Sequence, residues 1–249
     1  MRYQAKEYYD GALAIRLEKL GPDHVDVATT YNNLGVVHKN LGELEQAKEY
    51  HDRALAIRLE KLGLEHVDVA TTYNNLGIVH GKLGNLKEAK EFHDRALAIR
   101  LKKLGPEHLD VSMSYSNLGV VHGKLGNLKE AKEFHDRALA IRLKKLGPEH
   151  VNVARTFKNL GLVHRKLGNL EEAKEFHDRE LAIRLEKLGP GHVDVATTYS
   201  NLGTVHSDLG NLGRQKSVMI VALAIRLEKL GRWACSCRNH LQQPGYCTQ

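Results

Sequence analysis

The amino-acid sequence predicts an all-α protein in which antiparallel helix hairpins stack into an α-solenoid. Three observations lead to this fold class: an internal repeat of 42 residues, two helical patterns of apolar residues within each repeat, and a composition that favours helices. The repeat is clearest in glycines that each close an RLEKLG or RLKKLG segment and lie 42 residues apart, at Gly21, Gly63, Gly105, Gly147, Gly189 and Gly231.

These glycines divide the chain into repeat units. Residues 1–21 match only the second half of a unit, so we expect them to form the second helix of an incomplete repeat. Residues 232–249 have no repeat character and are expected to be disordered. Complete units occupy 22–63, 64–105, 106–147 and 148–189, and a degenerate unit occupies 190–231. One hairpin cannot bury its own apolar faces, so stacking on neighbouring units must supply the core.

Apolar residues recur at helical spacing in both halves of each unit. In the first half of the first complete unit they fall at Val27, Tyr31, Leu34, His38 and Leu41. In the second half they fall at Leu44, Ala47, His51, Leu55, Leu59 and Leu62. This spacing places the apolar side chains on one face of a helix. Each unit is therefore predicted to contain two amphipathic helices.

Turn residues separate the predicted helices. Between units, the glycine ends one helix and a proline commonly follows it, as helix ends favour. Within a unit, Leu83-Gly84-Asn85 ends the first helix. Asn85 followed by Glu88 forms a capping-box pattern, and it recurs as Asn127 with Glu130 and Asn169 with Glu172. We therefore expect these asparagine side chains to cap the second helices.

Composition excludes several classes of protein. Hydrophobic residues make up 42% of the chain and charged residues 27%, which indicates a folded protein with a packed core. Aromatic residues are only 6%, so the core must consist of Leu, Ala, Val and Ile. No apolar run approaches the length of about 18 residues that a membrane span needs, and MRYQAKEYYD lacks the apolar region of a signal peptide. We expect a cytoplasmic protein without a membrane partner.

Charge and cysteine content argue against a nucleic-acid-binding protein and against a disulfide-stabilised fold. The net charge is +7, but basic and acidic residues alternate closely, which is typical of solvated helix faces. Base-stacking aromatics are not interleaved with a basic stripe, so we expect no nucleic-acid partner. Cys235, Cys237 and Cys247 all lie outside the repeats, which excludes a disulfide framework.

The repeat unit resembles the tetratricopeptide repeat (TPR). That family places a large residue, Leu-Gly, an aromatic, Ala, an aromatic and Ala at fixed offsets, which are occupied here by Tyr31, Leu34, Gly35, His38, Ala47, His51 and Ala54. The common form has about 34 residues, and the extra length corresponds to about two helical turns. The 42-residue form, with YNNLG, RALAIR and LGPEH, is similar to the repeats of kinesin light chains and nephrocystin-like proteins. The resemblance covers residues 1–231 and implies a right-handed α-solenoid, the TPR superhelix.

Histidine is the residue type most suggestive of chemistry, because the chain has 15 of them. Nearly all recur with the repeat, in the turn between units (His24), in the first helix (His38) and in the second helix (His51). We interpret the helix histidines as packing residues with one hydrogen-bonded nitrogen and the turn histidines as caps or bridges, rather than as zinc ligands. No nucleophile elbow or phosphate-binding loop occurs. We expect no enzymatic activity, catalytic residue, metal or cofactor.

The resemblance places the first helix of each hairpin along a concave groove that touches an extended peptide. The predicted contact residues are polar side chains beside the packed seam and basic residues one turn further on. They are Asn32, Asn33, Lys39, Asn74, Asn75, Lys82, Ser116, Asn117, Lys124, Lys158, Asn159, Arg165, Lys166, Ser200 and Asn201. An asparagine amide can donate to and accept from a peptide backbone, and the basic residues favour acidic segments.

The function we predict is that of a protein-interaction scaffold or adaptor that binds short, extended and acidic peptide segments. One alternative is a cargo adaptor of a microtubule motor, as the similarity to kinesin light chains implies. The other is a structural assembly role in which open repeat ends associate with one another. The partners expected in each case are other proteins or peptides.

Overall fold

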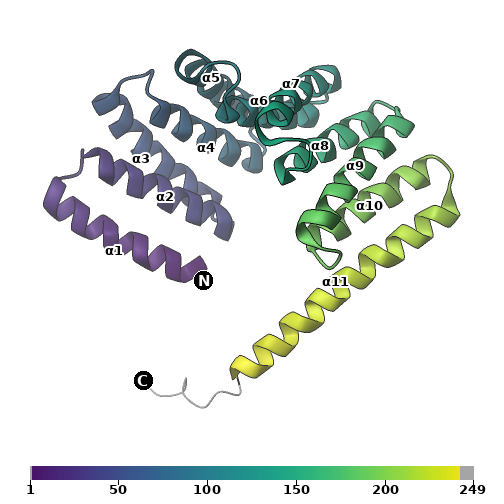
Figure 1. Ribbon diagram of the computed structural model, residues 1–249. Helices are drawn as coiled ribbons and strands as arrows, with labels where there is room; N and C mark the ends of the chain where they lie inside the picture. Colours follow the sequence, from purple (N-terminus) through teal and green to yellow (C-terminus); the bar gives the residue numbers. More distant parts are fainter. Residues whose placement is uncertain (1, 242–249) are drawn as a thin grey trace. The chain divides into compact units, whose positions relative to one another are not determined.

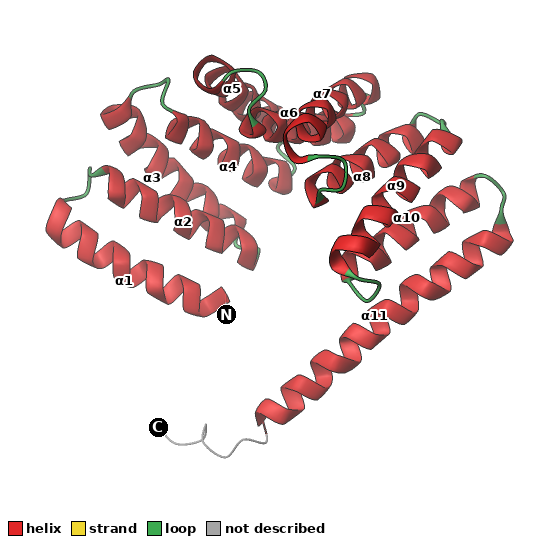
Figure 2. Ribbon diagram, viewed as in Figure 1, coloured by secondary structure: helices red, strands yellow, loops and turns green. Residues whose placement is uncertain are grey.

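The computed structural model describes the backbone of residues 2–241 and the side chains of residues 4–228. This part of the chain consists of α-helices joined by short turns, without a β-strand (Figures 1 and 2). The helices are α1 (Arg2–Leu20), α2 (Val25–Leu41), α3 (Leu44–Leu62), α4 (Val67–Leu83), α5 (Leu86–Leu104), α6 (Leu109–Leu125), α7 (Leu128–Leu146), α8 (Val151–Lys166), α9 (Leu170–Leu188), α10 (Val193–Asp208) and α11 (Leu212–Leu241). None of the described helices is both long and apolar enough to cross a membrane. The predicted all-α fold class is confirmed.

The chain forms two compact units, Met1–Ile141 and Arg142–Gln249. In the first, α2 packs on α3 and α4 on α5, and in the second, α8 packs on α9 and α10 on α11 (Figure 2). Each hairpin then packs on the next one within its unit, through α3 with α4 and α9 with α10. The first helices also touch one another, α2 with α4, α4 with α6, and α8 with α10. This arrangement is the stacked-hairpin solenoid that the repeat predicts.

The first helices begin at the turn histidines. His24 Nδ1 accepts a hydrogen bond of 3.1 Å from the backbone N–H of Asp26, which has no partner within the helix. The same cap recurs at His66, His108, His150 and His192. The prediction that the turn histidines cap helices is confirmed.

The capping boxes predicted at Asn85 and Asn169 are wrong. Asn85 and Asn169 stand at the N-caps of α5 and α9, but neither side chain forms a capping hydrogen bond. Gly84, at φ 90°, reverses the chain, and the backbone N–H of Asn85 donates to the His80 carbonyl 3.0 Å away. Asn85 consequently has ψ 71° instead of the extended conformation of a side-chain cap. At this helix boundary, the chain forms a left-handed turn at Gly84 in place of the side-chain cap expected at Asn85.

Inside the hairpins of the four complete repeats, a histidine ring of the second helix lies flat against a glycine of the first. A Cβ atom added to Gly77 would lie 2.7–2.8 Å from ring atoms of His93, far inside van der Waals contact. The same contact joins Gly35 to His51, Gly119 to His135 and Gly161 to His177, whereas Gly203 meets Met219. A second seam of rings runs beside it, as where Tyr73 and Phe92 lie 5.9 Å apart. Glycine is therefore required for the two helices to approach this closely.

Apolar side chains and a buried arginine join neighbouring hairpins. Leu55 and Leu59 of α3 pack against a cluster that contains Val69 and Ala70 of α4. Beside this cluster, Arg58 is only 4% exposed. Its Nη1 donates to the Asp68 carbonyl at 3.1 Å and to Thr72 Oγ1 at 2.7 Å. Five arginines make this pair of bonds to the following first helix, namely Arg16, Arg58, Arg100, Arg142 and Arg184.

The last helix departs from the repeat. α11 runs as one helix to Leu241, so residues 232–241 are helical where the sequence led us to expect disorder. Gly231 lies inside this helix and does not end it, because no proline follows until Pro244 and the residues between include helix formers such as Ala234 and Arg238. The remainder of the predicted disordered tail, residues 242–249, lies outside the described residues.

Candidate functional site

A pocket of about 240 Å³ lies between two neighbouring first helices, α4 and α6. Its lining comes from both helices and from the ring that supports α4: Gly77, Ile78, Gly81, Lys82, His93, Asn117, Val120, Val121 and Lys124. Pockets that enclose small-molecule ligands usually measure about 300–1,000 Å³, so this one has room for a side chain or two. Three of the predicted groove residues, Lys82, Asn117 and Lys124, meet here.

Glycine at position 81 keeps this pocket open. The equivalent position holds Lys39 in the first complete repeat and Arg165 in the fourth. A Cβ atom on Gly81 would have the Cβ of Ala89 as its nearest neighbour, at 3.7 Å, which is ordinary contact. A side chain at this position is therefore sterically allowed, and its absence leaves space above the floor formed by Gly77 and His93.

Lysines make the rim of the pocket basic. Lys82 and Lys124 are exposed, and Lys124 Nζ donates to the Gly81 carbonyl at 2.8 Å, which holds the ammonium at the edge of the pocket. Partial burial, together with the positive charge of Lys82, lowers the pKa of Lys39 below its usual value. Within the described residues, none of the three lysines forms an ion pair. Basic side chains placed together without a carboxylate partner attract anionic groups.

Several of the predicted groove asparagines bond to one another across neighbouring repeats. Asn75 Nδ2 donates to Asn32 Oδ1 at 2.9 Å, and Asn117 Nδ2 donates to Asn74 Oδ1 at 2.8 Å. Asn32 and Asn74 are buried, as is Ser116 at the equivalent position of the next repeat. Of the asparagines predicted to line the groove in the first unit, Asn33, Asn75 and Asn117 are half-buried and retain exposed surface. These side-chain bonds therefore join the first helices of neighbouring repeats.

In the second unit the predicted residues are more dispersed. Arg165 Nε donates to Asp208 Oδ2 at 2.6 Å, so an acidic residue already compensates its charge. Ser200 accepts a hydrogen bond of 3.2 Å from Arg226 Nη2. Lys158, Asn159 and Asn201 are half-buried on the first helices, and Lys166 is exposed. The basic, unpaired character of the groove is thus strongest on α2, α4 and α6.

The helix histidines are packing residues. His51 is fully buried, and neither of its ring nitrogens has a hydrogen-bond partner within the described residues, contrary to the prediction that one would be bonded. Burial, reinforced by the charges of Lys39 and Arg58, lowers the pKa of His51 to about 4, and burial likewise lowers the pKa of His93 to about 4. These rings are therefore neutral at physiological pH. Among the described residues, no three His, Cys, Asp or Glu side chains are grouped to hold a metal ion.

The arginines that join repeats were missed by the sequence reasoning. The helical pattern treats the second arginine of RALAIR as a solvated residue. Arg100, which stands at this position, is nevertheless only 2% exposed and donates to Ser114 Oγ at 2.8 Å. A recognisable signal was present, because a serine or threonine follows 14 residues after each of Arg16, Arg58, Arg100, Arg142 and Arg184. Glu180 was missed as well. It stands where other repeats have alanine and is fully buried among His177, Arg184 and Thr198.

Comparison with protein families and solved structures agrees with this geometry. Models described as "Tetratricopeptide repeat" match residues 2–60, 26–102, 68–144, 110–186 and 152–214, and another of the same description matches 195–241. No curated protein sequence matches the chain.

Several solved structures share the fold. The crystal structure of BtubC (BKLC) from P. vanneervenii superposes with a TM-score of 0.73 at 22% identity, covering 92% of this chain and 90% of that chain. A Podosopora anserina putative kinesin light chain with nearly identical TPR-like repeats gives a TM-score of 0.69 at 22% identity, covering 83% and 98%. MamA gives a TM-score of 0.54 at 17% identity, covering 80% and 97%. At these identities the likeness concerns the fold, and together with the family matches along the described helices it shows that the chain belongs to the tetratricopeptide repeat family.

Proposed function

We propose that this chain is a scaffold that binds extended acidic peptide segments along the first helices α2, α4 and α6. The tetratricopeptide repeat fold serves in general as a protein-interaction scaffold. The observation that carries the finer proposal is the set of basic residues Lys39, Lys82 and Lys124 on α2, α4 and α6, whose charges have no carboxylate partner within the described residues. Peptide carboxylates are the natural counter-ions for such a surface.

The pocket between α4 and α6 supplies a second contact. Its lining includes the apolar side chains of Ile78, Val120 and Val121, while Lys82 and Lys124 stand at its edge. An apolar side chain of the bound segment would fill the pocket, and an adjacent carboxylate would meet the lysines. The half-buried amide of Asn117 would bond to the peptide backbone, because its carbonyl oxygen is not used by the bond to Asn74.

The test is a binding screen of an acidic peptide library against the wild-type chain and a set of groove variants. Lys82→Ala with Lys124→Ala removes the rim charge, and Gly81→Arg fills the pocket with the residue that the fourth repeat carries. We expect each to weaken binding by at least tenfold, and raised salt to weaken wild-type binding further. Lys87→Ala, an exposed lysine on α5, is the matched control and should leave affinity unchanged. Equal binding by wild type and both groove variants would overturn the site.

A motor-adaptor role is the second candidate. It is favoured by the fold shared with a protein described as a putative kinesin light chain with TPR-like repeats. Co-sedimentation of the chain with purified kinesin heavy chain tests it directly, and absence of co-sedimentation would leave the general scaffold role in place.

A further inference from the structure

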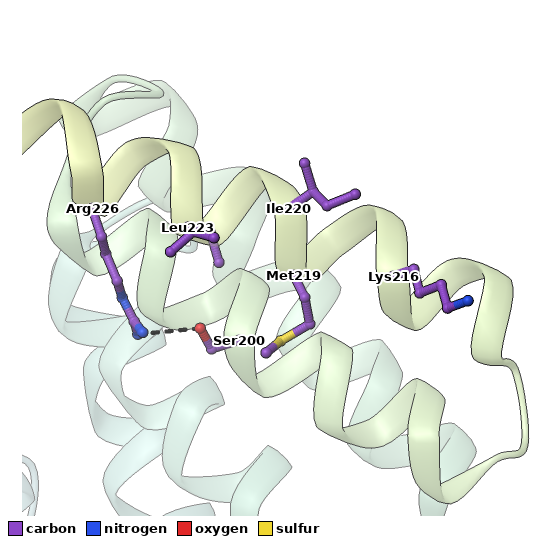
Figure 3. Close-up of a pocket in the computed structure, with 7 residues that line it drawn as sticks. Ser200, Lys216, Met219, Ile220, Leu223 and Arg226 are labelled. Carbon is purple, nitrogen blue, oxygen red and sulfur yellow. Dashed lines mark hydrogen bonds between the residues drawn. The ribbon is translucent and has the colours of Figure 1, made fainter.

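A second pocket, of about 390 Å³, lies on the last hairpin, formed by α10 and α11. It is lined by Ser200 of α10 and by Lys216, Met219, Ile220, Ala222, Leu223 and Arg226 of α11 (Figure 3). Leu223 and, one turn further on, Leu227 are each 57% exposed. The last hairpin thus presents large apolar side chains beside a pocket.

Each leucine stands at a position that other repeats cover with a helix. Leu223 and Leu227 are equivalent to Leu55 and Leu59, which pack against Val69 and Ala70 at the start of α4. Within the second unit the preceding pair, Leu181 and Leu185, packs in the same way against Val195 and Ala196 of α10. The exposed leucines of α11 are therefore one side of an interface that the chain builds repeatedly.

Arg226 also stands at a position that bonds to the following first helix in other repeats. It is equivalent to Arg58 and Arg184, whose guanidinium groups donate to a backbone carbonyl and to a threonine hydroxyl of the following first helix. Arg226 instead turns back to its own hairpin, where Nη2 donates to Ser200 Oγ at 3.2 Å (Figure 3). Its side chain is exposed, and within the described residues its other N–H groups have no acceptor.

Ser200 is a third residue of the pocket at a position that contacts the next repeat elsewhere in the chain. It occupies the position of Asn32 and Asn74, whose side chains accept a hydrogen bond from the first helix of the next repeat. The apolar character of this end is also increased, because Ile220 replaces the aspartate that pairs with lysine in the preceding repeat, Asp178 with Lys174. Three pocket residues, Ser200, Leu223 and Arg226, thus hold the positions that bind a first helix elsewhere.

We propose that this face of α11 binds, in trans, an amphipathic helix of another protein that carries the pattern Val-Ala-x-Thr-x-x-Asn. The pattern follows from the junction between α3 and α4, in which Val69 and Ala70 meet the leucines, Thr72 meets the arginine, and Asn75 meets Asn32. Continuity with these internal interfaces identifies the occupant as a helix with small apolar residues and a hydroxyl, instead of an extended acidic segment. The proposal is independent of the groove function, which uses other helices.

The experiment measures binding of a fluorescently labelled synthetic peptide with the sequence of residues 64–85 to the full chain by anisotropy. We expect saturable one-to-one binding. The variants Leu223→Asp and Arg226→Ala should each weaken it at least tenfold, as should Val69→Asp within the peptide. Leu223 and Arg226 are exposed in the protein, so both variants should retain the wild-type circular dichroism spectrum.

Val221→Arg is the matched control on the same helix. The equivalent arginine of the preceding repeat, Arg179, lies over the ring of Phe157 in its own hairpin, 5.9 Å from the ring centroid, so this direction leads away from the proposed interface. The control should bind like wild type. Binding that survives Leu223→Asp and Arg226→Ala, or loss of binding in Val221→Arg alone, would overturn the proposal. A wild-type chain that self-associates through Leu223 and binds no peptide would overturn it in favour of a second copy as the occupant.

Discussion

The contact between Gly77 and His93 shows how a single residue sets the spacing of a hairpin. His93 is 2% exposed, and its ring occupies the space in which any Cβ at position 77 would stand. Gly81, one turn later in the same helix, has no such neighbour. The two glycines therefore have opposite roles, since one permits helix packing and the other keeps a surface pocket open.

Gly77→Ala should lower the free energy of unfolding by about 1–3 kcal/mol, because the added methyl overpacks a buried contact that neither helix backbone can relieve. Gly81→Ala should be neutral or raise stability by up to about 1 kcal/mol, because alanine is favoured in a helix interior. Urea unfolding of both variants checks the pair. Equal destabilisation by the two substitutions would contradict the assigned roles.

The buried histidines predict a pH dependence of stability. The pKa of His93 is about 4 in the folded chain and returns to about 6.5 on unfolding, so below pH 6.5 the unfolded chain binds a proton that the folded chain does not. This contribution to stability is complete above pH 6.5 and is lost as the pH falls toward 4. We expect a loss of about 2–3 kcal/mol per such histidine by pH 4.

Urea unfolding at pH 7 and pH 4.5 measures this loss. His93→Gln removes one titrating ring, so the difference between the two pH values should shrink in the variant even though its stability at pH 7 falls. A difference that stays as large as in wild type would show that His93 is not the group responsible.

At the scale of the helices, the junction between repeats combines apolar packing with a buried arginine. Burial lowers the pKa of Arg142 to about 10, which still leaves its guanidinium charged at physiological pH. The charge is tolerated because Nη1 donates to the Asn152 carbonyl and to Thr156 Oγ1, at 3.3 Å and 2.7 Å. The arginine stem also covers apolar surface, so this residue contributes both packing and hydrogen bonds.

Arg100→Met should lower stability by about 1–3 kcal/mol, because the methionine retains the stem but leaves part of the hydrogen-bonding capacity of Ser114 and the Asp110 carbonyl unused in a buried place. The matched control is Arg95→Met on the same helix. Arg95 is exposed, and its guanidinium lies 5.7 Å from the ring centroid of Tyr73. Loss of this guanidinium should lower stability by less than about 1 kcal/mol. Thermal unfolding of both variants makes the comparison, and a larger effect at Arg95 would refute the role given to Arg100.

At the scale of the whole molecule, stability depends on the interfaces between repeats that are adjacent in sequence. Among the described helices, α1 contacts α2 alone and α11 contacts α10 alone, whereas α4 contacts helices of the repeats on both sides. In such an array the stability of each hairpin is close to the sum of its own terms and those of its adjacent interfaces. The terminal helices therefore have the smallest number of stabilising interfaces.

Amide hydrogen exchange should follow this gradient. Amides of α1 and α11 should exchange through openings of lower free energy than those of α4 and α5, because opening an end breaks one interface and opening the interior breaks two. Exchange monitored by mass spectrometry on the intact chain resolves these segments. Uniform protection from α1 to α11 would indicate a single cooperative unit in place of a nearest-neighbour array.

The regular parts of the fold could be predicted from sequence because each local signal recurs. Apolar spacing predicted the two helices of every unit, and the recurring glycines predicted the helix ends except at Gly231, which lies inside α11. The caps were less predictable, because the side chain of Asn85 competes with a left-handed turn at Gly84 that already satisfies the backbone. Periodicity alone does not reveal such competition.

The candidate site could be predicted only in outline. Sequence placed Asn74 and Asn117 on the same surface, but it does not show that one amide accepts from the other across two repeats. The pocket was also missed, because it results from a side chain that is absent, at Gly81. Glu180 escaped for a similar reason, since a carboxylate in an amphipathic pattern is interpreted as solvated unless its three buried partners are known.

The arginine junction has a consequence for how this chain can change over evolutionary time. Its contacts use a backbone carbonyl, one hydroxyl and small apolar residues, all of which recur in every unit. Excision of residues 64–105 from the gene would bring Arg58 to Asp110 and Ser114, the same partners that Arg100 has now. Unequal recombination that adds or removes whole blocks therefore preserves each junction, while any other length of insertion puts the arginine out of register. The number of repeats can therefore differ between alleles, whereas the spacing between each arginine and its partners must stay the same.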